Sequence, residues 1–335
     1  MKKILLLAIL FGFINGYSQG SKTPVLAKVT ATWCSKCGTW GWSFMEEMKS
    51  AYGQSMDAVI LGVHYSGNLE NPLGVWYRNN MSASGQPVFL LNNEDQNVFS
   101  SNWSARVETV KNKIIDIASE APAQDFNFIN AYVNDADEIV AQVNFRPHMA
   151  VDNDYYFGVY IFENNVEETQ ATRGTSLHPN VLRDVISDNF YGDLVFSAGD
   201  ISPANNMTRE YNKLINPSWN AQQVGLVGIL WKKQGTVYEI ENAAVIYNIG
   251  LLSSNNELID EDLITVKNRF DNIEINLEDN ENYNVSLVNN IGQIIDQKQF
   301  AVSTIIETSG LPSGIYTLHF SQDNKRLNKQ IFIGR

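Results

Sequence analysis

The spacing of apolar and polar positions divides the chain into regions of different hydrophobic periodicity. Between residues 24 and 120, two segments repeat their apolar residues at helical spacing, at 39–52 and 105–118. Short apolar runs in the same region predict three buried strands, at 25–31, 58–64 and 86–91. Because these strands alternate with helices, the region is expected to form an α/β sheet.

From about Ala121 to Gly250 the pattern becomes that of an all-β region. Ile139, Ala141, Val143 and Phe145 alternate with Val140, Gln142 and Asn144, and this two-residue period predicts a strand with one face in the core. Further strands are expected at 155–162, 224–231 and 243–249, and one short helix at 180–186 after a proline. Several short strands separated by polar loops predict a β-sandwich domain.

A polar, acidic stretch follows and predicts a linker, and the chain after it is again a run of short strands. Strands at 284–288, 314–320 and 329–333 predict a small β-sandwich of about the minimum size for independent stability. We therefore expect an α+β multidomain fold. Its divisions are a signal peptide at 1–18, an α/β domain at 19–120, a β-sandwich domain at 121–250, a linker at 251–265 and a C-terminal domain at 266–335.

The N-terminus has the pattern of a cleaved secretory signal. Lys2 and Lys3 precede an apolar run at 4–14, and small residues permit cleavage after Ser18. The run is too short to span a bilayer, and no later segment is long and apolar enough to do so as a helix. A buried N-terminal strand or helix is the alternative. Export from the cytoplasm is the interpretation that the pattern favours.

The net charge restricts the partners that the chain can have. Its formal charge is −13 at pH 7 and its sequence pI is about 4.8, with no run of Lys or Arg. An acidic surface repels phosphate backbones, so we do not expect nucleic-acid binding.

The two cysteines, Cys34 and Cys37, are separated by two residues, where a predicted strand leads into a predicted helix. A disulfide Cys34–Cys37 closes so small a loop that it stabilises a fold weakly. Thiol–disulfide exchange suits the spacing better, because the first sulfur lies at a helix N-terminus and the second lies one turn later. A structural or vestigial disulfide remains the alternative.

Metal chemistry is the other use of paired cysteines. A zinc site needs two further ligands, and the four histidines, His64, His148, His178 and His319, are isolated in the sequence. We therefore expect no metal site and no cofactor.

The segment Ala31-Thr-Trp-Cys-Ser-Lys-Cys37 resembles the thioredoxin superfamily, including the Trp before the first cysteine. Gly85-Gln-Pro-Val88 resembles that superfamily's cis-proline loop. The resemblance implies a thioredoxin-like α/β domain in which Cys34 attacks and Cys37 resolves. It also implies that Trp33, Gln86 and Pro87 contact the bound substrate.

One position departs from the superfamily pattern. Thioredoxin has a buried carboxylate six residues before the first cysteine, and this chain has Lys28 there. A partly buried Lys28, or Lys36 inside the motif, can lower a thiol pKa by its charge. Lys28 does not replace a carboxylate base, and it can instead extend to the surface. Efficient general reductase activity is therefore less expected than specialised or weak exchange.

The segment Leu177-His-Pro-Asn-Val-Leu-Arg183 resembles a signature of the roughly 28-kDa outer-membrane-protein family of Bacteroidetes. Members of that family join a thioredoxin-like half to a β-sandwich half, and the match would cover residues 24–250. Taken alone, His178 and Arg183 are expected to be structural, since such residues commonly satisfy helix caps or carboxylates.

The C-terminal region resembles the type A sorting domain of the type IX secretion system. The resemblance rests on Tyr283–Gly292, on Leu311–Leu318 with its Gly-Ile-Tyr element, and on the basic residues that precede the last strand. The usual Pro-Asn-Pro opening is absent, and Lys267–Asp271 stands in its place. A further adhesive sandwich domain is the alternative. The resemblance implies export by the type IX machinery, removal of the tail, and release or attachment to surface polysaccharide.

Two functions are therefore compatible with the sequence. The first is a secreted or cell-surface thiol–disulfide oxidoreductase, associated with the outer membrane, whose partners are protein thiols or disulfides. The second is a surface binding or adhesion protein that uses the thioredoxin-like domain as a scaffold, and its motivation is the large aromatic-rich β region. Hydrolase signatures such as G-x-S-x-G are absent, so a hydrolase is not expected.

Overall fold

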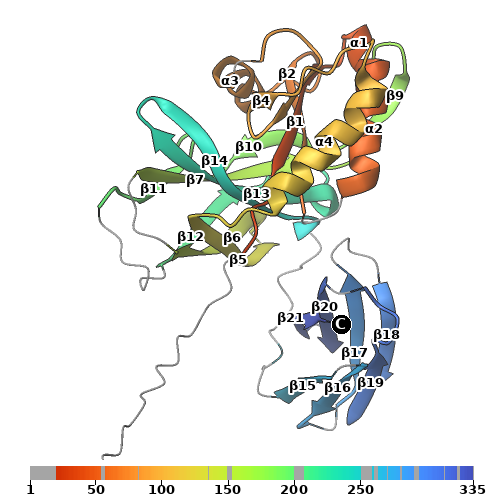
Figure 1. Cartoon of the computed structure of the whole chain (residues 1–335). Helices are drawn as coiled ribbons and strands as arrows, with labels where there is room; N and C mark the ends of the chain where they lie inside the picture. The colour runs from red at the N-terminus through yellow and green to blue at the C-terminus, as the bar shows by residue number, and fades with distance from the viewer. Residues whose placement is uncertain are drawn as a thin grey trace, which may run out of the picture.

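The structure is a computed structural model, and the elements of the chain are shown in Figure 1. It describes residues 20–53, 57–81, 83–134, 136–148, 153–199, 207–249, 259, 263–269, 271–279, 281–289, 294–312, 314–322 and 325–334. The predicted signal peptide and most of the predicted linker lie outside the described residues. Within the described part of the chain, no helix is long and apolar enough to cross a membrane.

The first region alternates strands with helices, as its pattern predicts. In chain order its elements are β1 (Val25–Ala31), α1 (Ser35–Gly38), α2 (Trp40–Tyr52), β2 (Val59–Ser66), α3 (Pro72–Asn80), β3 (Val88–Leu91), β4 (Glu94–Asp95) and α4 (Trp103–Ala118). Strand β1 pairs with β2 in parallel and with β3 in antiparallel orientation, and β3 pairs with β4. The predicted strands and both predicted helices of this region are confirmed within a few residues at their ends.

Helix α3 has no counterpart among the helices predicted from the sequence. Asn71 caps it by accepting a hydrogen bond from the Gly74 backbone N–H at 2.8 Å, and Pro72 occupies its first turn. An Asn followed by Pro is a helix-start signal that could have found it.

The middle region adds strands to the same sheet. Its elements are β5 (Gln124–Val133), β6 (Glu138–Pro147), β7 (Asp154–Glu163), β8 (Val166–Gln170), β9 (Gly174–His178), β10 (Val181–Val185), β11 (Asp193–Phe196), β12 (Met207–Leu214), η1 (Ala221–Gln223), β13 (Val224–Gln234) and β14 (Val237–Ile246). Neighbouring strands follow the order β14-β13-β7-β10-β2-β1-β3-β4, with β11 also paired to β7. One nine-stranded sheet therefore crosses from the first region into the second.

The helix predicted at 180–186 is wrong, because this segment is strand β10. It pairs antiparallel with β7, and it meets β2 in parallel through the pair Val181–Gly62. Buried Asn180 extends that contact, since its side-chain Nδ2 donates to the Ile60 carbonyl at 2.9 Å and its own carbonyl accepts from the Gly62 N–H at 2.9 Å. Sheet pairing therefore outweighs the weak local helical pattern.

A second sheet packs against the middle part of the first one. It has the order β12-β6-β5, and the core between the sheets contains the side chains of Phe126, Phe145, Phe157, Leu226 and Leu230. Two sheets packed through alternating apolar residues form a sandwich-like arrangement. The β-rich, sandwich-like character expected for this region is confirmed.

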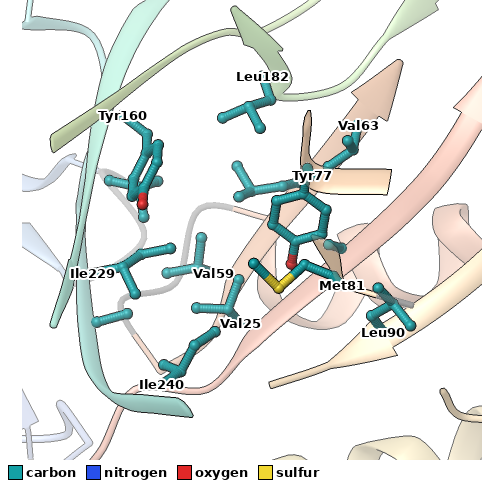
Figure 2. Close-up of a cluster of buried hydrophobic side chains, with 14 of the residues drawn as sticks. Val25, Val59, Val63, Tyr77, Met81, Leu90, Tyr160, Leu182, Ile229 and Ile240 are labelled. Carbon is teal, nitrogen blue, oxygen red and sulfur yellow. The ribbon is translucent and has the colours of Figure 1, made fainter. Parts of the chain in front are cut away.

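The two regions also share a hydrophobic core, which Figure 2 shows. Val59, Val63 and Tyr77 come from the first region, whereas Tyr160 and Ile229 come from the second, and all belong to one buried cluster. The opposite face of β1, β2 and β3 is covered by α2 and α4, whose cluster includes Phe44, Met48, Phe89 and Val110. The predicted boundary between residues 120 and 121 stays a prediction.

The C-terminal region forms two small sheets around a core of its own. Its strands are β15 (Ile264–Asn268), β16 (Asn272–Leu277), β17 (Tyr283–Asn289), β18 (Ile294–Phe300), β19 (Ser303–Glu307), β20 (Gly314–Gln322) and β21 (Lys325–Ile333). The sheet orders are β15-β16-β19 and β18-β17-β20-β21. The buried cluster of this region takes all its members from residues 259–333.

Candidate functional site

The cysteine pair lies where β1 ends and the short helix α1 begins. Cys34 is the N-cap of α1, and its Sγ accepts a hydrogen bond from the Cys37 backbone N–H at 3.1 Å. The two residues are joined by a disulfide with a Cα–Cα distance of 5.2 Å. Cys37 is fully buried, and Cys34 is 5% exposed, so only the first sulfur is near the surface.

The residues predicted to contact substrate lie around this pair. Trp33 is 53% exposed, and its indole N–H donates to Ser66 Oγ at 3.0 Å. The Gln86–Pro87 peptide bond is cis, and Gln86 Oε1 accepts from the Tyr65 hydroxyl at 2.8 Å. A Cβ added to Gly41 of α2 would lie 2.5 Å from Pro87 Cγ, so the proline is pressed against the start of α2.

Lys28 does not extend to the surface. Its side chain is buried within the protein, where Nζ donates to the Cys37 carbonyl at 3.2 Å and lies 5.3 Å from the Trp42 ring centroid. Burial is the main cause that lowers the pKa of Lys28 to about 7. The positive charge of Arg173 acts in the same direction, and the carboxylate of Glu46 opposes both effects. The ammonium group therefore loses its proton near neutral pH.

A small cavity of about 90 Å³ lies beside Lys28. Its walls include Lys28, Thr30, Trp42, His64 and His178. Thr30 Oγ1, His64 Nδ1 and His178 Nε2 are buried and have no hydrogen-bond partner among the described residues. The cavity has room and polar groups for ordered water.

Both histidines of this cavity are held neutral. Burial lowers the pKa of His64 well below its usual range, with smaller contributions from His178 and Lys28. Burial also lowers the pKa of His178 to about 4, and the charge of Lys28 acts in the same direction. The two rings form an edge-on pair with centroids 5.0 Å apart.

The hairpin formed by β8 and β9 covers the cysteine loop from the middle region. Gln170, at the end of β8, donates from Nε2 to the Cys34 carbonyl at 3.0 Å, and Arg173 in the turn lies over the Trp42 ring at 4.7 Å. These residues had no signal in the sequence, because neither belongs to a motif and both lie more than 130 positions after the cysteines.

The other residues singled out in the sequence make their contacts away from the two sulfur atoms. Lys36 is exposed on α1, and no described contact of its side chain reaches the cysteines. Arg183 binds Glu163 through an ion pair of 2.7 Å, and His178 packs edge-on against Trp42 at 5.3 Å. Among the described residues, no three His, Cys, Asp or Glu side chains gather closely enough to hold a metal ion.

The arrangement defines a β-rich multidomain protein with a separate C-terminal module. Residues 269–334 match the family model of the secretion system C-terminal sorting domain. The chain is thus exported by the type IX secretion system, to the cell surface or the medium, with surface or outer-membrane association. No curated protein matches the sequence.

Solved structures resemble the chain to different extents. HBP35 of Porphyromonas gingivalis aligns with a TM-score of 0.56 and 14% identity, over 94% of this chain and 99% of that one. Red sea bream transglutaminase aligns with a TM-score of 0.23 and 11% identity, over 76% of this chain and 38% of that one. A Ruminococcus gnavus β-glucuronidase reaches a TM-score of 0.17 and 10% identity, over 59% and 35%. Of these three likenesses, only the first has a TM-score high enough to describe a shared fold.

Proposed function

We propose that the chain is an exported thiol–disulfide oxidoreductase whose exchange centre is the Cys34–Cys37 disulfide. The observation that carries the proposal is the position of Cys34 as the N-cap of α1, with Sγ 3.1 Å from the Cys37 backbone N–H. A donor at this distance stabilises a thiolate more than a thiol. Cys37 follows in the same turn, where it can resolve a mixed disulfide.

The topology around the pair supports a thioredoxin-like unit. Strands β2, β1, β3 and β4 are neighbours in that order, with α2 and α4 on one face and α3 on the other. The cysteine motif follows the central strand, and the cis proline precedes the next strand of that group. This is the arrangement expected of the superfamily that the motif resembles.

The exchange reaction can be written with these residues. A thiolate of a substrate dithiol attacks Cys34 Sγ, the Cys34–Cys37 bond breaks, and Cys37 leaves as a thiolate that takes up a proton. The second substrate thiolate then attacks the mixed disulfide and releases Cys34 as a thiolate. The substrate is oxidised by two electrons and the cysteine pair is reduced by two; the reverse sequence reduces a protein disulfide.

Two measurements on the exported chain test this function. Insulin reduction and the dithiol midpoint potential should both be measurable in the native chain, and insulin reduction should be lost in Cys34→Ser. Ser35→Ala is the matched control, because it changes an exposed neighbour in the same helix and keeps both sulfurs. Equal rates in the native chain and Cys34→Ser would contradict the proposal.

A second function is favoured by a separate observation, an aromatic group in the middle region. Tyr191 and Tyr238 are stacked with centroids 3.7 Å apart, and Lys233 lies 5.8 Å from the Tyr238 ring. Partly exposed rings of this kind suit surface binding or adhesion, with the cysteine unit as a scaffold. Undiminished binding to glycan arrays after replacement of both cysteines would favour this alternative. Attachment of the chain to surface polysaccharide stays a prediction.

A further inference from the structure

We propose that the β8–β9 hairpin is a working part of the redox centre, in which Gln170 and Arg173 are positioning residues that set the reduction potential of Cys34–Cys37. The proposal rests on the function proposed above, and it makes the centre a property of residues 20–249. Neither residue is adjacent to the cysteines in sequence. From the turn of one hairpin, Gln170 reaches the Cys34 carbonyl and Arg173 reaches the Trp42 ring beside Lys28.

Gln170 holds the backbone that carries the first cysteine. Its side chain is 1% exposed, and Nε2 lies 3.3 Å from the Ala31 carbonyl, 3.0 Å from the Thr32 carbonyl and 3.0 Å from the Cys34 carbonyl. These three carbonyls converge where β1 turns into α1. Each of these carbonyls also accepts a backbone N–H, from Cys34, Ala171 and Gly38 in turn, so the Gln170 amide is a second donor shared by all three and ties the hairpin to the loop.

The turn after Gln170 packs closely against α1. The Ala171 N–H donates to the Thr32 carbonyl at 2.8 Å, and Thr172 Oγ1 donates to the Ser35 carbonyl at 3.4 Å. A Cβ on Gly38, the last residue of α1, would collide with the Ala171 carbonyl oxygen. The hairpin is therefore seated on the cysteine helix at van der Waals distance.

Arg173 adds positive charge on the same side. Its guanidinium lies over the Trp42 ring at 4.7 Å and 3.5 Å from Glu46 Oε1. Its charge is felt at the buried end of Lys28, where it favours loss of the Lys28 proton and so lowers the pKa of that amine. Since Lys28 Nζ contacts the Cys37 carbonyl, the same field acts at the cysteine pair.

Both effects act on the balance between the oxidised and the reduced pair. Two glutathione thiols reduce Cys34–Cys37 to two cysteines and become glutathione disulfide, and the Cys34 thiol then releases its proton to solvent. A positive field stabilises that thiolate more than the neutral disulfide, and the fixed loop keeps the Cys37 N–H directed at Cys34 Sγ, a hydrogen bond that is stronger to a thiolate than to a disulfide sulfur. Stabilising the reduced form raises the potential and makes the pair more oxidising.

The experiment uses the full exported chain equilibrated at pH 9, above the pKa of Lys28, with mixtures of glutathione and glutathione disulfide, followed by alkylation and mass measurement. Gln170→Met removes the amide donor at similar length, and Arg173→Gln removes the charge. We expect each to lower the equilibrium constant for reduction by about threefold to tenfold, the effect of one hydrogen bond or one nearby charge. The pH midpoint for alkylation of Cys34 should rise in Gln170→Met.

Two further variants separate this role from a merely structural one. Arg173→Lys keeps the charge and should recover most of the potential lost in Arg173→Gln. Glu167→Gln changes an exposed residue of the same hairpin that has no described contact with the cysteine loop, and its equilibrium constant should stay within about twofold of the native value.

The outcomes are distinct. Unchanged potentials and alkylation profiles in Gln170→Met and Arg173→Gln would overturn the inference, as would equal shifts in Arg173→Gln and Arg173→Lys. If Gln170→Met fails to fold, the comparison of Arg173→Gln with Arg173→Lys still tests the inference. The reduction potential of the disulfide is measured with glutathione and needs no protein substrate. If the native chain failed to reduce insulin, that result would count against the oxidoreductase proposal and would not affect the measured role of the hairpin.

Discussion

The cysteine-bearing part of the chain and the sorting domain are built on different principles. In residues 20–249, one buried cluster combines Val59 and Tyr77 with Tyr160 and Ile229, and one sheet contains strands from both regions. In the sorting domain the cluster is drawn from residues 259–333 alone. A change in sequence pattern therefore coincides with a separate buried cluster at the second junction, whereas the residues on the two sides of the first junction share one.

The largest expected effect is the loss of cooperative folding when the first region is separated from the second. Residues 20–120 on their own should fail to fold cooperatively, because β2 loses its partner β10 and the apolar face around Val59 and Tyr77 is exposed to water. Circular dichroism and amide dispersion in NMR spectra would report the loss.

The matched control is the chain of residues 20–249, which keeps the whole sheet and should unfold in a single transition. A stable, cooperative fold in residues 20–120 would instead support the predicted boundary at residue 120 as a true domain limit.

The next largest effect comes from a pair of core truncations. Trp231, buried in the shared cluster, donates to the Tyr160 hydroxyl at 2.8 Å, whereas Phe320 is buried in the sorting-domain core. Each change to Ala should cost about 3–5 kcal/mol in its own unit. With both cysteines reduced, Trp231→Ala should lower the denaturant midpoint for labelling of Cys37.

Phe320→Ala should leave that midpoint where it is in the native chain. A similar fall in both variants would mean that the sorting domain and the cysteine unit unfold together, and the contrast between the two regions would be lost.

A smaller effect concerns the buried amine. The folded-state pKa of Lys28 is about 7, below the ordinary 10.5, so between these values the unfolded chain holds a proton that the folded chain has released. The free energy of unfolding therefore rises with pH between about 7 and 10.5 because of this group. The gain is lost again as the pH falls back to 7. The free energy of unfolding should rise by about 2 kcal/mol more from pH 7 to pH 9 in the native chain than in Lys28→Met.

The exposed Lys36 provides the control, since Lys36→Met should retain the pH dependence of the native chain. Denaturant titrations at a series of pH values would measure it. The same slope in Lys28→Met and the native chain would exclude a deprotonating amine at this position.

Removal of the sorting domain is expected to have the smallest effect on the cysteine centre. A chain ending at Ile249 should keep the reduction potential and the midpoint for Cys37 labelling of the full chain, while secretion is lost. Glutathione equilibration and localisation of the truncated protein would check the two parts separately. A changed potential would reveal a contact between the units.

The sequence was sufficient for local features and insufficient for contacts across the chain. The strand ending at Ala31, the helix after Thr39 and the cis proline all follow from residues that are neighbours in sequence. Strand β10 was missed, because its identity depends on pairing with β2 and β7 and on the Asn180 side chain. Propensity carries no information about such partners.

The same distinction between local features and long-range contacts applies to the residues of the candidate site. Cys34, Cys37 and Pro87 could be placed from their motifs, and Lys28 could be located but its burial could not. Gln170 and His178 could not be assigned to the site, since a glutamine at a strand end and a histidine before a proline have many ordinary uses. Their roles arise from a hairpin that packs on a helix formed 130 residues earlier.

The close seating of the hairpin on Gly38 has a consequence for how relatives of this chain can diverge. Any side chain at this position would meet the Ala171 carbonyl, so the glycine and the hairpin constrain each other. Lineages that keep the hairpin should keep a glycine after the second cysteine, and lineages that shorten it should be free to vary there. That one residue would then serve as a marker in genome sequences for whether a distant β-hairpin still covers the cysteines.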